Sequence, residues 1–212
     1  MPDVEANEVI GMAGPIKAIG LLVTIVFAIG LILYAAKSNR AATKADNLTS
    51  TLGGPFELAA RDGSTVTNQT LAGKPYAIFF GYTRCPDVCP TSLARMARLR
   101  KQLGADGKKF NIVFVSVDPE HDKPADIASY VDMFGTAIIG LTGTEAQLNK
   151  IEKRFGVFVR RVPMDPSQPE GDYTIDHTAA IYLMSATGAL IGTIDHQESN
   201  ATALEKVKRL IA

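Results

Sequence analysis

The chemistry of this chain is concentrated at its two cysteines, Cys85 and Cys89, in the segment GYTRCPDVCPTSL. Each cysteine is followed by a proline, and three residues separate the pair. Two thiols this close can form a structural disulfide, act as a redox couple or supply half of a metal site. A disulfide that closes so small a loop removes little entropy from the unfolded chain, so stability is a poor reason for it. A reactive or metal-binding role is therefore favoured.

The cysteine pair falls between a predicted buried strand, YAIFFGY over residues 76–82, and a predicted helix. Pro90 suits the first helical position, which would put Cys89 near the cap and Cys85 in the preceding loop. Free N–H groups at a helix N-terminus stabilise a thiolate, and Arg84 beside the pair is expected to add to this effect. Thiol oxidoreductases commonly use Cys-x-x-Cys, whereas the longer spacing here leaves more room for a shared ion.

Two thiolates alone rarely complete a metal site, which directs attention to the three histidines. His121 lies in a charged loop and His196 follows a predicted hairpin, so both are expected to be solvated. His177 lies directly before a buried strand, and the predicted topology brings the loop entering that strand beside the cysteines. Cys85, Cys89 and His177 would form a soft site suited to copper, with zinc as the chemical competitor. Because neutral imidazole is the ligand, binding should weaken as the pH falls toward about 6.5, the unperturbed pKa of histidine.

The elements that must position these residues alternate between strands and helices. In order, they are a hairpin over 55–75 with Asp62 and Gly63 in its turn, a strand over 76–82, a helix from about 91 to 104, a strand over 111–118, a helix over 124–135, a strand over 138–143, a helix over 144–156, an irregular loop, a hairpin over 179–195 with Thr187 and Gly188 in its turn, and a helix over 201–212. This order predicts an α/β, thioredoxin-like fold with a mixed central sheet.

A long apolar segment precedes this domain. Residues 18–36 contain no charged side chain. As a helix with a rise of about 1.5 Å per residue, the segment would span about 28 Å, close to the hydrocarbon thickness of a bilayer and longer than the core of a cleaved signal peptide. The sequence therefore predicts a short tail over 1–17, a single transmembrane helix over 18–36, a linker over 37–54 and one domain over 55–212.

The charge balance excludes one class of partner and complicates the topology. The chain has 22 basic and 22 acidic residues, so it lacks the excess positive charge of a nucleic-acid-binding protein. Lys37, Arg40 and Lys44 follow the predicted span and Lys17 closely precedes it. Read literally, the positive-inside rule would put the domain in the cytoplasm.

Three segments together resemble a known family. FFGYTRCPDVCPTSL, VFVSVDPEHDKP and DYTIDHTAAIYL, in this order, resemble the Sco (SenC/PrrC-type) copper chaperones of cytochrome c oxidase assembly, and the match covers most of residues 50–210. The resemblance implies that Cys85, Cys89 and His177 bind one copper ion, as Cu(I) or Cu(II). It also implies a single-pass protein of the bacterial inner membrane with its domain in the periplasm, against the simple charge rule. There it would help to build the dinuclear copper centre of oxidase subunit II, by delivering copper or by keeping that subunit's cysteines reduced. A copper donor and a thiol reductant are further implied partners.

Some residues depart from the family pattern or have a less defined role. His121 stands where the family commonly has arginine, and FELAARDG is a less typical opening hairpin. Asp176, beside the histidine ligand, and Asp118, at a strand end, are expected to orient the ligands or the loop. Two other functions stay open. One is a periplasmic thiol–disulfide oxidoreductase, or a peroxiredoxin-like enzyme, without stable metal binding and with Cys85 and Cys89 as catalytic thiols. The other is a redox or copper sensor, for which the sequence encodes no output domain.

Overall fold

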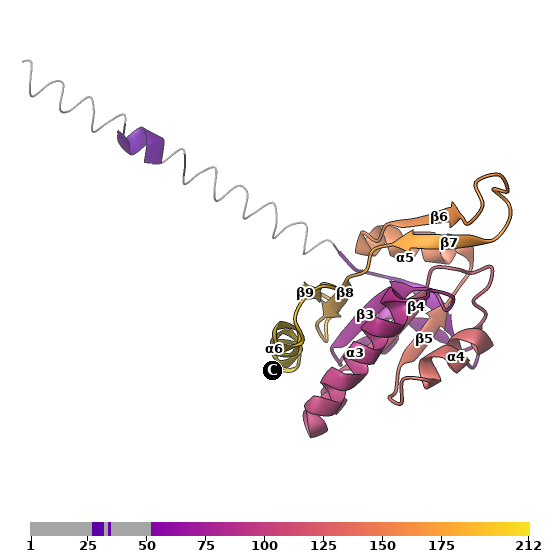
Figure 1. Cartoon of the computed structure of the whole chain (residues 1–212). Coiled ribbons are helices and arrows are strands. Elements are labelled where there is room, and N and C mark those ends of the chain that lie inside the picture. Colours follow the sequence, from indigo (N-terminus) through magenta and orange to yellow (C-terminus); the bar gives the residue numbers. More distant parts are fainter. Residues whose placement is uncertain (1–26, 32–33, 35–51) are drawn as a thin grey trace, which may run out of the picture. The chain divides into compact units, whose positions relative to one another are not determined.

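The computed structural model describes residues 27–31, 34 and 52–212 (Figure 1). The chain divides into two compact units, Met1–Leu48 and Thr49–Ala212. Within the described ranges, no helix combines the length and the apolar character that a membrane crossing requires. The predicted transmembrane helix over 18–36 lies mostly outside the described residues, together with the tail and most of the linker.

The second unit is built on a mixed sheet of seven strands in the order β2–β1–β5–β4–β3–β8–β9. The central strands β3, β4 and β5 run parallel, and the remaining neighbours pair in antiparallel fashion. The strands are β1 (Glu57–Ala60), β2 (Thr65–Thr67), β3 (Tyr76–Gly81), β4 (Asn111–Ser116), β5 (Ile139–Thr142), β8 (Ile181–Met184) and β9 (Leu190–Ile194). The mixed α/β class and both predicted hairpins are confirmed, but the first hairpin is shorter than the predicted range 55–75, because Asn68–Leu71 is helical.

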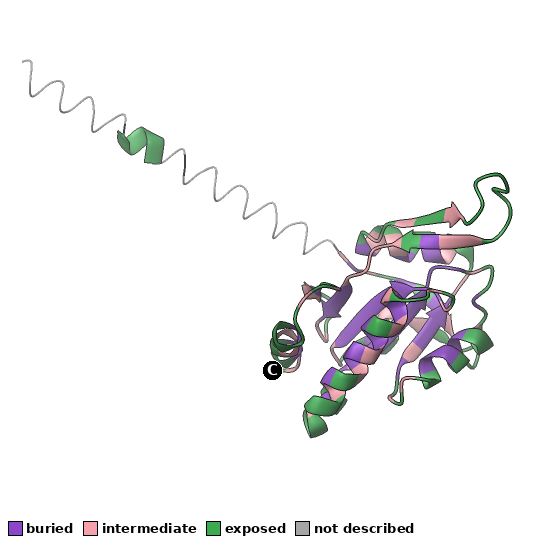
Figure 2. Cartoon of the chain, viewed as in Figure 1, coloured by how far each residue is buried: buried purple, intermediate pink, exposed green. Residues whose placement is uncertain are grey.

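Helices cover both faces of the sheet. They are α2 (Asn68–Leu71), α3 (Val88–Gln102), the 3-10 helix η1 (Gly104–Lys109), α4 (Pro124–Asp132), α5 (Glu145–Phe155) and α6 (Asn200–Ile211). Successive residues of a strand point to opposite faces, so Phe79 and Phe80 of β3 serve different layers. Phe80 packs against Phe155 of α5 at 5.3 Å between ring centroids, whereas Phe79 packs against Phe114 on the other face. Figure 2 shows the resulting buried sheet and the exposed outer faces of the helices. Burial on both faces explains why β3 is apolar throughout rather than alternating.

The helix that carries Cys89 begins earlier than the sequence predicts. Its first residue is Val88 and its N-cap is Asp87, so Cys89 is the second helical residue and Pro90 the third. Placing Pro90 at the first helical position was therefore wrong. Proline is tolerated in the first turn because the N–H groups there lack partners within the helix, which makes a proline a weak marker of the exact start.

The predicted irregular loop after α5 contains a second, two-stranded sheet. It pairs β6 (Val159–Pro163) with β7 (Tyr173–His177) in antiparallel fashion, with Val159 opposite His177. Most residues of both strands are exposed or only partly buried. The hairpin was missed because β6 shows no apolar alternation, and its two strands are linked by a long polar segment.

Arg95 of α3 is a buried cation that joins two distant parts of the fold. The sequence places Arg95 among the polar residues of an amphipathic helix, yet only 6% of its surface is exposed to solvent. Its guanidinium donates to Asn200 Oδ1 at 2.9 Å, to the Asp195 carbonyl at 3.0 Å and to the Glu198 carbonyl. These bonds tie α3 to the turn that leads into α6.

We expect Arg95→Ala to lower the free energy of unfolding by about 3 kcal/mol, because several buried acceptors lose a charged donor. Urea denaturation followed by circular dichroism would measure this change. Arg98→Ala is the matched control, since Arg98 lies on the exposed side of the same helix and should change stability by less than about 0.5 kcal/mol. Equal effects of the two substitutions would contradict the structural role of Arg95.

Candidate metal centre

The two cysteines lie at the carboxyl end of β3, where the strand passes into α3. The Cys85 N–H donates to the Tyr82 carbonyl at 3.3 Å, and Cys85 is half-buried in this loop. Cys89 is fully buried in the first turn of α3. A Cβ atom added at Gly81 would lie 2.6 Å from Cys89 Sγ. Glycine at the end of β3 is therefore what lets the thiol approach the strand.

The structure brings together the three residues that the sequence singles out. One ligand atom each of Cys85, Cys89 and His177 lies within 4.8 Å of the others, and Cys89 Sγ is 3.5 Å from His177 Nε2. Two sulfur ligands at about 2.3 Å from one ion can be about 4.6 Å apart at most, so the group is close to binding geometry. Among the described residues, His121 and His196 do not belong to this group.

A backbone contact selects the tautomer of His177. Its Nδ1 lies 3.1 Å from the Thr178 carbonyl, which can only accept a hydrogen bond. In the neutral ring Nδ1 must therefore carry the proton, which leaves the lone pair of Nε2 directed at Cys89. Thr178 is itself held by the residue that precedes β6, because its N–H donates to the Phe158 carbonyl at 3.0 Å. This is the arrangement that a metal-ligating imidazole needs.

Aromatic rings fix the position of the imidazole. Phe79 and Tyr82 meet the His177 ring edge to face, with centroid distances of 5.9 Å and 6.0 Å. The Tyr82 hydroxyl also lies 2.8 Å from Thr174 Oγ1 and accepts the Ile175 N–H at 3.3 Å. Tyr82 thus connects the loop of Cys85 to the strand of His177.

The two thiols have divergent acidities. A hydrogen bond from Cys89 is the main cause that lowers the pKa of Cys85 to about 3, and the backbone N–H groups of Asp87 and Cys89 contribute further. The same interaction, together with burial, raises the pKa of Cys89. Cys85 is therefore the thiolate and Cys89 the thiol that donates to it. The expected effect of the helix N-terminus is present, whereas the partner of the thiolate is Cys89 rather than Arg84.

Arg84 belongs instead to a polar cluster beside the site. Its guanidinium is 3.0 Å from His121 Nδ1 and 3.7 Å from Asp118, whose side chain is fully buried. Asp118 accepts a hydrogen bond from the Tyr173 hydroxyl at 2.7 Å and lies 3.1 Å from His121 Nδ1. Only 36% of the His121 side chain is exposed, so this residue is a member of the cluster rather than a freely solvated histidine. Asp118 links the Cys85 loop to the start of β7, as expected for a residue that orients the loop.

The expected role of Asp176 is different in the structure. Its carboxylate is exposed and pairs with Arg160 at 2.6 Å, and the orienting contact to the His177 ring comes from the Thr178 carbonyl. Asp176 therefore stabilises the β6–β7 pairing and not the ligand directly.

Asp122 is a functional residue that the sequence analysis missed. Its buried carboxylate accepts hydrogen bonds from the N–H and hydroxyl of Thr83 at 3.0 Å and 2.5 Å, and from the Ser116 hydroxyl at 2.6 Å. Burial raises the pKa of Asp122. Asp122 therefore holds Thr83, two positions before Cys85, against the end of β4. Its location in a charged loop gave no sign that it would be buried.

The fold and site define a class of protein: a thioredoxin-like domain in which two thiols and one imidazole lie close enough together to hold a single soft metal ion. Residues 44–212 match the SCO1/SenC family model, so the chain belongs to the SCO1/SenC family. Bradyrhizobium japonicum ScoI with copper bound is a solved structure with 42% sequence identity and a TM-score of 0.68. The match covers 75% of this chain and 99% of that one. A chain that corresponds to the second unit alone thus folds by itself in a relative.

Two yeast proteins, the first of them from Saccharomyces cerevisiae, are also similar to this chain. Mitochondrial protein SCO2 is 35% identical over 161 residues, which cover 76% of this chain and 53% of that protein. Yeast Sco1 with copper bound has 31% identity and a TM-score of 0.68, over 75% of this chain and 87% of the solved one. The chain spans about half to two thirds of the length of the first curated relatives it matches.

We expect Gly81→Ala to weaken metal binding by about tenfold to a hundredfold, since the added methyl would displace Cys89 Sγ and overpacking typically costs about 1–3 kcal/mol. Competitive titration with a chelator would measure the loss. Gly192→Ala in β9 is the control, because a Cβ there meets nothing within 4 Å. An unchanged affinity in Gly81→Ala would contradict the close approach.

We expect the alkylation rate of Cys85 in the metal-free protein to be nearly independent of pH between about pH 5 and 8, because the thiolate is already formed. Cys89→Ala removes the donor to that thiolate, so the pKa of Cys85 should rise and the rate should then increase with pH. Stopped-flow alkylation with mass spectrometry of the labelled cysteine tests both statements. A wild-type rate that climbs steeply with pH would show that Cys85 is not a preformed thiolate.

Proposed function

We propose that this protein is a copper metallochaperone that carries one copper ion on Cys85, Cys89 and His177. The observation that carries the proposal is the convergence of two sulfurs and one imidazole nitrogen within 4.8 Å. Thiolate and imidazole donors favour copper over hard cations. The copper named for the ScoI and Sco1 structures, both relatives in the same family, supports this choice of cargo.

The residues of the site have distinct roles in this function. Cys85 is half-buried and already a thiolate, so it is the natural first contact for an arriving ion. Cys89 loses its proton as the ion binds, and His177 completes the set through Nε2. Cys85 and Cys89 are not joined by a disulfide, which is the state that binding requires. Oxidation to a disulfide would remove both sulfur ligands, so the redox state of the pair gates loading.

The family resemblance supports a proposal for the client and for the location. We propose that the protein assists assembly of the dinuclear copper centre of cytochrome c oxidase subunit II, by delivering copper or by reducing that subunit's cysteines. The domain would stand in the periplasm, held to the bacterial inner membrane by the predicted helix over 18–36. The apolar length of that segment supports the anchor. A copper donor and a thiol reductant complete the proposed set of partners.

A thiol–disulfide oxidoreductase is the second candidate, and the low pKa of Cys85 favours it. In this reaction the Cys85 thiolate attacks a client disulfide, a mixed disulfide forms and one client thiolate leaves. Cys89 then gives up its proton and attacks Cys85, which yields the Cys85–Cys89 disulfide and a reduced client. The reaction needs no imidazole ligand, so it should survive His177→Ala.

Titration of the reduced unit Thr49–Ala212 with Cu(I) against a competing chelator should give one tight ion per chain. His177→Ala should weaken binding by more than about 100-fold, the largest loss typical of residues outside the ligand shell. His196→Ala is the matched control and should bind normally. Weak binding, or binding indifferent to His177, would favour the oxidoreductase. Reduction of a model disulfide by the same variants would then test that alternative.

A further inference from the structure

A second concave site lies at the end of the sheet opposite the candidate metal centre. β3 and β4 both run from this end toward the cysteines, with Tyr76 paired to Asn111 at their start and Gly81 to Ser116 at their end. A cavity of about 1060 Å³ opens here between the C-terminal end of α3, η1 and the loop after α4. The proposed copper function makes no use of it.

The cavity is lined by cations without carboxylates. The basic lining residues are Lys74, Arg98, Arg100, Lys101 and Lys108, and no aspartate or glutamate joins them. Two nearby acidic residues are engaged elsewhere, Asp106 with Lys109 and Asp132 with Arg61, each at 2.8 Å. Within the described part of the chain, the five lining cations form no ion pair. In a chain with equal numbers of basic and acidic residues, this is a local excess of positive charge.

Arg100 is built into the wall of this cavity. Its guanidinium donates to the carbonyls of Phe110 and Ala137 and lies 4.9 Å from the centroid of the Phe110 ring. These neutral partners hold the side chain in place but leave its positive charge uncompensated. An anion that approaches the cavity would therefore meet a fixed cation as well as four others.

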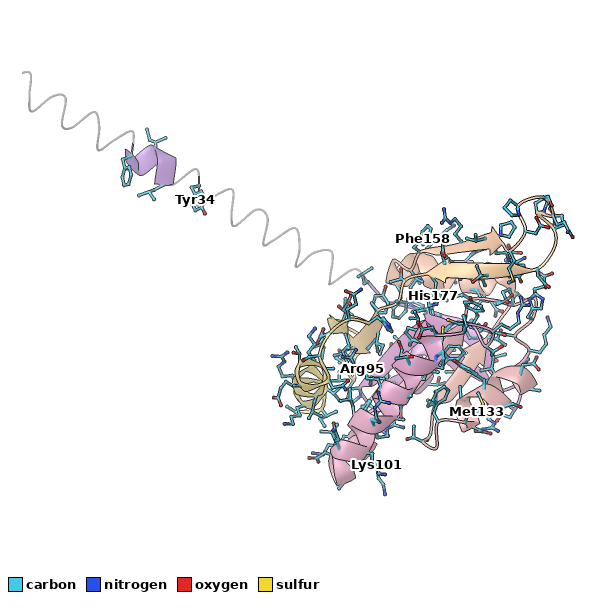
Figure 3. All side chains as sticks on the ribbon, viewed as in Figure 1. Tyr34, Arg95, Lys101, Met133, Phe158 and His177 are labelled. Carbon is cyan, nitrogen blue, oxygen red and sulfur yellow. The ribbon has the colours of Figure 1, made fainter. Side chains whose placement is uncertain are left out.

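An exposed apolar side chain accompanies the cations. Met133 also lines the cavity, and it is 70% exposed. Basic side chains beside an exposed apolar residue form the pattern by which proteins bind the surface of an anionic bilayer, where cations meet headgroups and apolar groups reach the acyl boundary. Figure 3 shows Lys101 and Met133 on the side of the domain away from His177.

We propose that this face docks onto a bilayer containing anionic phospholipids. A second observation supports a membrane rather than an acidic protein as the occupant. Gly53, one of the first described residues of the domain, lies at this same end of the sheet, beside the β8–β9 turn. A Cβ atom added to Gly53 would be 3.0 Å from Met184 Cε and 3.4 Å from the Gly188 carbonyl oxygen. The Gly73 N–H, next to Lys74, donates to Ala186 in that turn. The chain that precedes the domain thus joins it at the end that carries the cations.

Docking in this orientation has a consequence for the copper site. The cysteines and His177 lie at the far ends of β3 and β4, so they would face away from the bilayer and stay open to a partner. The cation face would then hold the domain in one orientation relative to the bilayer.

The test is co-sedimentation of the unit Thr49–Ala212 with vesicles of phosphatidylcholine alone or with about 30% phosphatidylglycerol, at low salt and at about 0.5 M salt. We expect binding to the anionic vesicles, loss of binding at high salt and little binding to phosphatidylcholine. The double variant Arg98→Glu, Lys101→Glu should lower the partition coefficient by at least about 30-fold, from about 1 kcal/mol for each basic residue. Met133→Gln should weaken binding at unchanged charge.

The matched control is Lys150→Glu, Lys153→Glu, which reverses two exposed cations at the same spacing on α5. This variant should keep the larger part of the binding. No binding of the wild-type unit to anionic vesicles at low salt would overturn the proposal, as would equal losses in the two double variants. Competition by inorganic phosphate at millimolar concentration would also overturn it, since it would identify a small-anion site. Cu(I) titration of the same variants should be unchanged, so failure of the docking and failure of the copper function can be told apart.

Discussion

The candidate metal centre depends on how the β6–β7 hairpin is held against the ends of β3 and β4. Two phenols do this. Tyr82 accepts the Ile175 N–H and packs against the His177 ring, and Tyr173 donates to the buried Asp118. Without these contacts, an exposed hairpin would have little reason to stay beside the cysteines, because its strands bury few side chains. The three residues of the candidate metal centre therefore lie at two sheets of one domain, and the contact between these sheets is polar and aromatic.

The polar part of this contact relies on buried carboxylates, and burying a carboxylate has a large cost in free energy. Asp118 and Asp122 are both removed from solvent, and an unpaired buried carboxylate would cost several kcal/mol. Each is satisfied by neighbours on the segments that must be aligned: Tyr173 for Asp118, and Thr83 with Ser116 for Asp122. Removal of a donor would leave a buried carboxylate without a hydrogen-bond partner, which is costly. These contacts therefore strongly favour one geometry. That property suits a site whose ligands must meet within a fraction of an ångström.

The sheet also separates two kinds of chemistry. At the carboxyl ends of β3 and β4 the backbone N–H groups of the α3 N-terminus help to hold a thiolate, whereas at the opposite end α3 and η1 end in a group of cations. The same helix thus supports negative charge at its start and carries positive charge at its end, as the peptide dipoles favour. The direction of α3 alone would thus favour the metal site at one end of the sheet and the proposed membrane-facing surface at the other.

The sequence by itself determined the α/β class, the main strands and helices, and the cysteine pair of the site, because these depend on local signals. Buried strands such as β3 are apolar runs, α5 is marked by Thr144 at its N-cap and Gly156 after its end, and Cys85 and Cys89 are neighbours in the chain. Adding His177 required the predicted topology and the family pattern. Tertiary structure alone decided the β6–β7 pairing, the burial of Asp122 and Arg95, and the thiolate partner of Cys85. Each of these arises from contacts between residues far apart in sequence, or from the direction in which a side chain points, and neither leaves a periodic trace in the chain.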